Sequence, residues 1–237
     1  MAAQSLDTHL TWASERHLRI NLAAATFKDN AETVHLALAA IKRARLPGLV
    51  SMTPAASTIL LEFDPDQLDE TQAADAVRKA LQAAREQAAQ SDSPIIEIPV
   101  CYEPPCAPDA EDVARYHGID LATLIRMHTK PVYTVQFIGF APGFGYLSGL
   151  PTELATPRLD TPRVRVPAGS VGIAGDQTGI YPTATAGGWR LIGRTPLTMF
   201  DAGRERPSLL SARDRVRFIP IEYADFESRL RGLPDNA

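Results

Sequence analysis

The sequence predicts an α+β protein built from an N-terminal α/β sandwich and a C-terminal β-barrel. In the first hundred residues, stretches with apolar side chains at every second position alternate with stretches of helical spacing. From residue 133 onward, short apolar runs alternate with Gly and Pro turns, and no long helix is expected before residue 224. The 237 residues, of which 45% are hydrophobic, are enough to form a buried core in each part.

The first elements of the N-terminal part are a strand, a helix and two further strands. Residues 18–22 alternate apolar and polar side chains and predict a strand. Residues 30–46 carry apolar side chains at helical spacing, with Asn30 as the expected N-cap. Residues 49–52 and 58–63 predict two strands joined by a short turn.

A second helix and a last strand complete the expected sandwich. The helix is expected to start near Asp69, with Gln72 three residues later as its capping partner. Residues 95–100 are β-branched and predict the last strand. The order β-α-β-β-α-β is that of a ferredoxin-like fold. We therefore expect residues 1–100 to form a small α/β domain and residues 101–237 to form a connector followed by the barrel.

Two short helices, residues 109–117 and 121–128, are predicted to connect the halves. Their spacing resembles a DNA-reading helix-turn-helix, but acidic residues flank the pair and few basic residues could contact phosphates. A packed connector is the better interpretation, with no nucleic-acid partner. The expected barrel strands are residues 133–140, 163–166, 170–174, 179–181, 189–192 and 215–221.

Composition and charge restrict the class of protein. Residues 1–12 do not resemble a signal peptide, and no apolar run approaches the roughly 20 residues that cross a bilayer, which favours a cytoplasmic protein without a membrane partner. Cys101 and Cys106 lack further ligands at metal-binding spacing, so we expect two free thiols and no metal site. All 12 basic residues after residue 150 are Arg, whose planar group can grip an anion, although a general Arg preference in the genome explains this bias equally well.

The glycines, aromatic residues and arginines of residues 137–195 predict a polar pocket on the barrel. Residues 137–147 contain three Gly and three Phe, which suit a close backbone approach and an aromatic wall, but equally a tight barrel corner. Arg163 and Arg165 would lie on one face of a strand and could stabilise an anion. The candidate substrate-binding residues are Phe140, Pro142, Gly143, Phe144, Tyr146, Arg158, Gln177, Thr178, Tyr181 and Trp189.

These motifs resemble the family of the 5-oxoprolinase B subunit, also known as allophanate hydrolase subunit 1 or the sporulation-kinase-inhibitor family. The sequence departs from the family pattern at residues 101–106, where a Gly-rich turn is usual and this chain has Cys101 and Cys106 with two prolines between them. The resemblance is carried by residues 139–144, 146–147, 156–158, 162–163, 166–175, 177–182, 188–189 and 191–195.

The resemblance implies a cyclophilin-like barrel in a protein that cooperates with an A and a C subunit. In that system the ATP-dependent opening of 5-oxoproline yields glutamate, and we expect ATP, with Mg, to bind at a site shared with the partner. The family also implies two alternatives, a regulatory inhibitor of a sensor histidine kinase and a component of a urea- or allophanate-type amidohydrolase. For the enzyme, the expected catalytic residues are Arg163 and Arg165, with His128 as the proton-transfer group because a near-neutral pKa suits that task.

Overall fold

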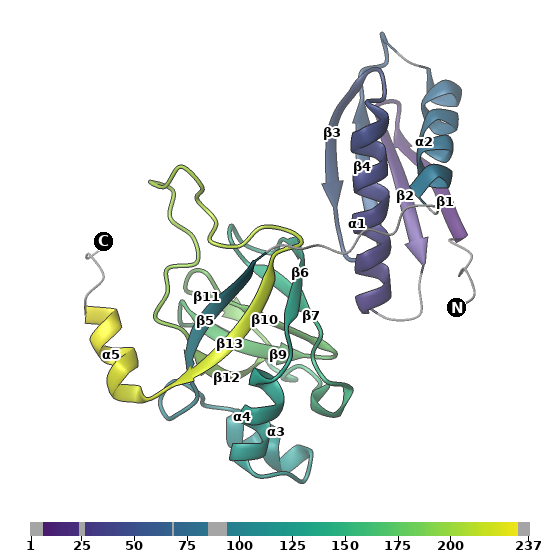
Figure 1. The fold of residues 1–237 in the computed structure, drawn as a ribbon. Coiled ribbons are helices and arrows are strands. Elements are labelled where there is room, and N and C mark those ends of the chain that lie inside the picture. Colours follow the sequence, from purple (N-terminus) through teal and green to yellow (C-terminus); the bar gives the residue numbers. More distant parts are fainter. Residues whose placement is uncertain (1–6, 24–26, 68, 85–93, 232–237) are drawn as a thin grey trace. The chain divides into compact units, whose positions relative to one another are not determined.

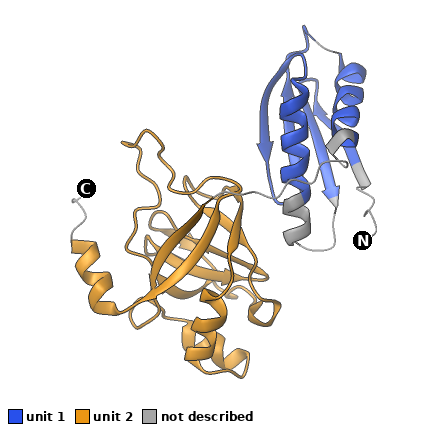
Figure 2. Cartoon of the chain, viewed as in Figure 1, with its two compact units in different colours: residues 1–92 blue, residues 93–237 orange. Residues whose placement is uncertain are grey.

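The computed structural model describes residues 7–23, 27–67, 69–84 and 94–231. The chain divides into two compact units, residues 1–92 and 93–237 (Figure 2). The predicted α+β class with a C-terminal barrel is confirmed, because the second unit contains a closed seven-stranded barrel and the first an antiparallel sheet with two helices.

The first unit is a four-stranded antiparallel sheet with both helices on one face (Figure 1). The side chains of β2 and β4 that are fully buried, among them Ile20 and Leu61, pack with Val34, Ile41 and Val77 of the helices into one core. Its elements are β1 (Asp7–Ser14), β2 (His17–Ala23), α1 (Phe27–Ala44), β3 (Leu49–Pro54), β4 (Thr58–Phe63) and α2 (Glu70–Ala84).

Two details of this unit differ from the sequence prediction. The strand expected at residues 95–100 is β5 (Ile95–Cys101), which belongs to the barrel, while β1 pairs with β2 at the edge of the first sheet. Periodicity identifies a strand but not its partner, so it could not place β5. The predicted N-cap Asn30 is wrong, because α1 begins at Phe27. The prediction for α2 is confirmed, since Asp69 Oδ1 accepts the Gln72 N–H at 2.8 Å.

The second unit is a closed barrel with strand order β10-β7-β6-β13-β5-β12-β9. Strand β5 is the first strand of this unit along the chain. It pairs in parallel with β13 along seven residues and so forms part of the barrel wall. The other barrel strands are β6 (Tyr133–Ile138), β7 (Gly145–Ser148), β9 (Ser170–Ala174), β10 (Gln177–Ile180), β12 (Arg190–Arg194) and β13 (Arg215–Ile221).

Further elements cover the barrel. The predicted strand β8 (Arg163–Val166) pairs with β11 (Thr185–Gly187) in a separate two-stranded ribbon. The connector helices α3 (Ala110–Tyr116) and α4 (Leu121–Thr129) contribute buried apolar residues to the barrel core, as expected for a packed connector. Helix α5 (Tyr223–Arg231) follows β13.

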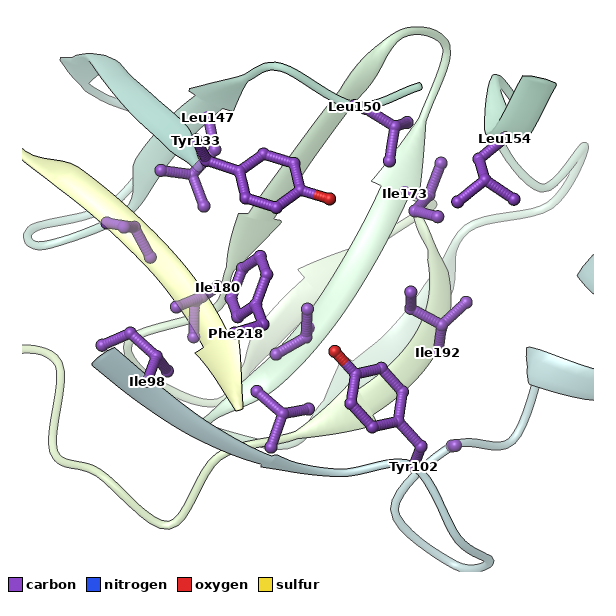
Figure 3. Close-up of a cluster of buried hydrophobic side chains, with 14 of the residues drawn as sticks. Ile98, Tyr102, Tyr133, Leu147, Leu150, Leu154, Ile173, Ile180, Ile192 and Phe218 are labelled. Atoms are coloured by element: carbon purple, nitrogen blue, oxygen red, sulfur yellow. The ribbon is translucent and has the colours of Figure 1, made fainter. Parts of the chain in front are cut away.

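The barrel interior is filled by side chains. Figure 3 shows Ile98, Ile173, Ile180 and Phe218 pointing inward from the surrounding strands, where each is at most 1% exposed. A packed interior of this kind stabilises the wall but leaves little room for a ligand at its centre. The candidate site therefore lies outside this packed interior.

Candidate functional site

Five aromatic side chains form a continuous group, which we call the aromatic cluster: Phe140, Phe144, Tyr146, Tyr181 and Trp189. The Phe144 ring is at its centre, with ring centroids 5.2 Å from Tyr181 and 5.4 Å from Trp189 at nearly perpendicular planes. These edge-to-face contacts are the favourable arrangement for aromatic pairs. The fold thus brings together aromatic residues of the candidate site that come from separate segments of the chain.

Glycines around the aromatic cluster make its packing possible. A Cβ at Gly179 would lie 3.0 Å from the Phe144 ring and 3.0 Å from the Gly145 carbonyl oxygen. A Cβ at Gly187 would overlap the Tyr181 hydroxyl group. Both positions need glycine because an aromatic ring occupies the space that any other side chain would fill.

Phe140 protrudes from the turn between β6 and β7 in a strained conformation. Its φ is +66° and its side chain is 61% exposed. The Ala141 N–H donates to the Gly139 carbonyl at 2.8 Å, which closes a γ-turn around Phe140. Two further hydrogen bonds, Phe144 N–H to Ala141 O and Gly139 N–H to Phe144 O, hold the turn rigid. A bulky residue with positive φ costs about 1–2 kcal/mol, so the hydrogen bonds of the turn hold an exposed ring in a conformation that the residue alone does not favour.

Two arginines give the aromatic cluster a positive edge. The guanidinium carbon of exposed Arg158 lies 6.0 Å from the centroid of the Trp189 ring. Burial raises the pKa of Tyr181, and the Trp189 backbone hydrogen bond and the charges of Arg158 and Arg163 oppose that rise. The combination suits a small ligand with a flat body and a negative group.

Arg163 is fixed by a partly buried ion pair with Asp109. The Arg163 Nη2 donates to Asp109 Oδ1 at 2.5 Å, and the side chains are 30% and 6% exposed respectively. The other carboxylate oxygen accepts the Leu191 N–H at 2.6 Å. Asp109 is absent from the sequence-predicted site, because its only local signal is its place just before a helix.

His128 lies inside the barrel and not in the aromatic cluster. Its ring is 0% exposed and stacks on Phe218 at a centroid distance of 4.6 Å. Burial lowers its pKa to about 3, so the expectation of a near-neutral pKa is wrong. A histidine in this environment is neutral at pH 7, and no bulk solvent reaches it to exchange a proton.

The hydrogen bonds of His128 define its tautomer. The Thr178 hydroxyl donates to the Gly172 carbonyl at 2.9 Å, so it must accept a hydrogen bond from His128 Nε2 at 3.1 Å. His128 Nδ1 then accepts from the Tyr102 hydroxyl at 2.8 Å. Figure 3 shows the Tyr102 hydroxyl pointing into the barrel interior. Thr178, a predicted substrate-binding residue, is thus fully buried and bonded within this network.

The other predicted site residues lie in different environments. Arg165 is exposed on β8, and Pro142 is exposed at the turn after Phe140. Gly143 is buried with φ +83°, a conformation that requires glycine in this turn. Gln177 is half-buried at the start of β10. Among the described residues, the interactions therefore bring together the aromatic cluster, Arg158 and Arg163. Within this group Phe144, Tyr181 and Trp189 are buried, whereas Phe140 and Arg158 are exposed.

The two cysteines are buried free thiols. Burial and a hydrogen bond with Cys101 raise the pKa of Cys106 to about 12. Both pack against Phe226 of α5. Within the described parts of the chain, no three His, Cys, Asp or Glu side chains are placed to hold a metal ion. No helix in those parts is long and apolar enough to span a membrane.

The class of protein is defined by the family model for the carboxyltransferase domain, subdomain C and D, which matches residues 8–210. The fold agrees, since the Kluyveromyces lactis urea carboxylase superimposes with a TM-score of 0.68 over 93% of this chain at 21% identity; the matched region is 22% of that chain. A conserved uncharacterized protein from Pyrococcus horikoshii is 38% identical, with a TM-score of 0.56 over 92% of this chain and 100% of its own.

Curated relatives narrow the class. The 5-oxoprolinase B subunit of Bacillus subtilis is 37% identical over 82% of this chain and 85% of its own length. The Escherichia coli O157:H7 protein of the same name is 44% identical over 74% of this chain and 79% of its own length. The chain therefore belongs to the family of the 5-oxoprolinase B subunit, as its sequence motifs indicated.

Proposed function

We propose that this chain is the B subunit of a cytoplasmic, ATP-dependent 5-oxoprolinase, which cooperates with the A and C subunits to convert 5-oxoproline to glutamate. The family supports the assignment, because its curated relatives are named as the B subunit of 5-oxoprolinase. That name describes a component of an assembly, so we expect the isolated chain to be inactive.

The observation that carries the proposal is that two guanidinium groups, those of Arg158 and Arg163, lie beside the aromatic cluster. 5-Oxoproline is a small five-membered lactam with one carboxylate. The exposed Phe140 ring and the half-buried Tyr146 ring offer an apolar surface for the lactam, with the buried rings of Tyr181 and Trp189 packed behind them. Arg158 and Arg163 supply positive charge for the carboxylate. In this proposal the exposed Phe140 ring covers the bound lactam at the tip of the turn.

ATP with Mg does not fit the described residues of this chain alone. The sequence lacks a Gly-Lys-Ser/Thr phosphate loop and has no Lys after Lys130. The described side chains include no cluster of acidic groups of the kind that holds Mg. We therefore propose that nucleotide binding requires a partner protein, and we assign no step with ATP to residues of this chain.

The proposal is tested by co-expression with the candidate A and C subunits. The purified assembly should hydrolyse ATP in a 5-oxoproline-dependent manner and form glutamate, whereas the chain alone should do neither. An intact assembly that shows neither activity with 5-oxoproline would overturn the substrate assignment.

Substitution of the arginines tests which of them serve the reaction. We expect Arg163→Ala to abolish turnover in folded assemblies, while Arg115→Ala leaves it unchanged. Arg165→Ala, on the same strand but outside the aromatic cluster, tests the catalytic role predicted from the sequence, which requires the same loss. Arg115 is the matched control because it forms an exposed ion pair with Asp112 on α3. Unchanged activity of both site variants would leave these arginines with a structural role only.

A further inference from the structure

Asp109 is a buried carboxylate that bonds to one residue through both its main chain and its side chain. Its N–H donates to the Leu191 carbonyl at 2.9 Å, and its Oδ2 accepts the Leu191 N–H at 2.6 Å. This exchange joins the residue before α3 to β12, although the two residues are 82 positions apart. Asp109 therefore occupies a fixed position, and its remaining oxygen, Oδ1, is available to orient another group.

That other group is the Arg163 guanidinium. Asp109 Oδ1 accepts from Nη2 of Arg163 at 2.5 Å. Because a guanidinium is planar and rigid, fixing Nη2 also fixes the direction of Nη1. Nη1 is buried and has no hydrogen-bond partner among the described residues. A buried donor without an acceptor costs about 1–3 kcal/mol, so a positioned guanidinium with one unbonded edge suits the binding of an additional acceptor.

The position of Arg163 indicates the chemistry of that acceptor. Arg163 lies opposite Gly187 in the ribbon of β8 and β11, and Gly187 packs directly against the Tyr181 phenol. The charges of Arg163 and Arg158 both act on Tyr181. Asp109 neutralises only one of these two positive charges. A ligand with a single negative charge would accept from the unbonded Nη1 of Arg163 and add the charge that balances Arg158 beside the aromatic cluster.

We propose that Asp109 is a positioning residue that holds Arg163 to bind the carboxylate of the lactam substrate. This inference rests on the proposed 5-oxoprolinase function and adds to it the residues that distinguish a carboxylate-bearing lactam from a neutral one. Asp109 itself touches no substrate, and its effect on binding passes through Arg163.

The test compares Asp109→Asn with wild type in the co-expressed assembly. We expect KM for 5-oxoproline to rise about tenfold or more, the factor that corresponds to losing one well-placed charge-assisted hydrogen bond, with kcat much less affected. The uncharged analogue 5-oxoprolinamide, assayed as a competitive inhibitor, should bind wild type and Asp109→Asn alike. The matched control is Asp112→Asn on α3, which removes the carboxylate of the exposed pair with Arg115 and should leave both constants unchanged.

A second variant covers the case in which Asp109→Asn does not fold. Arg163→Lys keeps the charge and Asp109 but loses the second donor edge, so it should also weaken 5-oxoproline selectively. Unchanged KM in folded variants, or equal weakening of 5-oxoproline and its amide, would make the ion pair purely structural and overturn the inference. In either case an active wild-type assembly would leave the proposed function standing, whereas an inactive one would overturn both.

Discussion

The buried His128 should make the barrel sensitive to mildly acidic pH. Its pKa is lowered to about 3 by burial, whereas the unfolded chain has the ordinary value of 6.5. Below pH 6.5 the unfolded state therefore binds a proton that the native state excludes, and stability falls as pH falls from about 6.5 towards 3. At about 1.36 kcal/mol per pH unit, the loss between pH 7 and pH 5 is about 2 kcal/mol.

The assay is urea unfolding at pH 7 and pH 5 followed by Trp189 fluorescence. The chain has two tryptophans, and Trp12 lies in the other unit, so a Trp12→Phe background restricts the signal to the barrel. His128→Gln keeps a neutral hydrogen-bonding side chain but cannot take up the proton. It should be less stable than its parent at pH 7, because the stacking on Phe218 is lost, yet it should lack the decline of about 2 kcal/mol expected for one shifted histidine.

The comparison with His128→Gln isolates this histidine, because His117 of the same unit is present in both proteins. The carboxyl groups of Asp120 and Asp225 have pKa values lowered from 3.8, so they remain ionised at both pH values. His9→Gln, a change in the first unit, should not alter the barrel transition. An equal decline in His128→Gln and its parent would refute the assignment to His128. Because the ring is buried and neutral, turnover by the assembly at pH 7 should also survive His128→Gln; loss of kcat in a folded variant would restore the proton-transfer role.

Three further predictions concern the turn, the glycines and the thiols. Phe140→Gly should be more stable than Phe140→Ala by about 1 kcal/mol in urea unfolding, because both lose the ring but only glycine accepts the positive φ without strain. Equal stabilities would mean that the turn stores no strain. Gly187→Ala should displace the Tyr181 ring and destabilise the barrel by about 1–3 kcal/mol. Gly188→Ala is its control, since a Cβ there meets its nearest neighbour at 3.6 Å, and similar effects of the two would contradict the packing argument. The Cys106 thiol, with its pKa raised to about 12, should react with a disulfide reagent far more slowly in native protein at pH 8 than in urea. Fast labelling of the native protein would contradict the burial of this thiol.

Short-range patterns in the sequence were sufficient to predict the α+β class, most barrel strands and the chain segments that supply the aromatic cluster. The β-branched and small residues of 170–174 and the Gly and Pro turns around them report local backbone geometry. The aromatic residues were predictable because they lie within the short sequence motifs that carry the family resemblance.

The pairing of strands and the meeting of polar groups depend instead on the folded chain. Strand β5 is predictable as a strand, but its seven-residue pairing with β13 joins segments more than a hundred residues apart. The same is true of side chains, since His128 bonds to Thr178 across 50 residues and Asp109 to Arg163 across 54. Burial lowers the pKa of His128, and a long-range hydrogen bond to Asp109 fixes the direction of Arg163. Local sequence patterns carry no information on either.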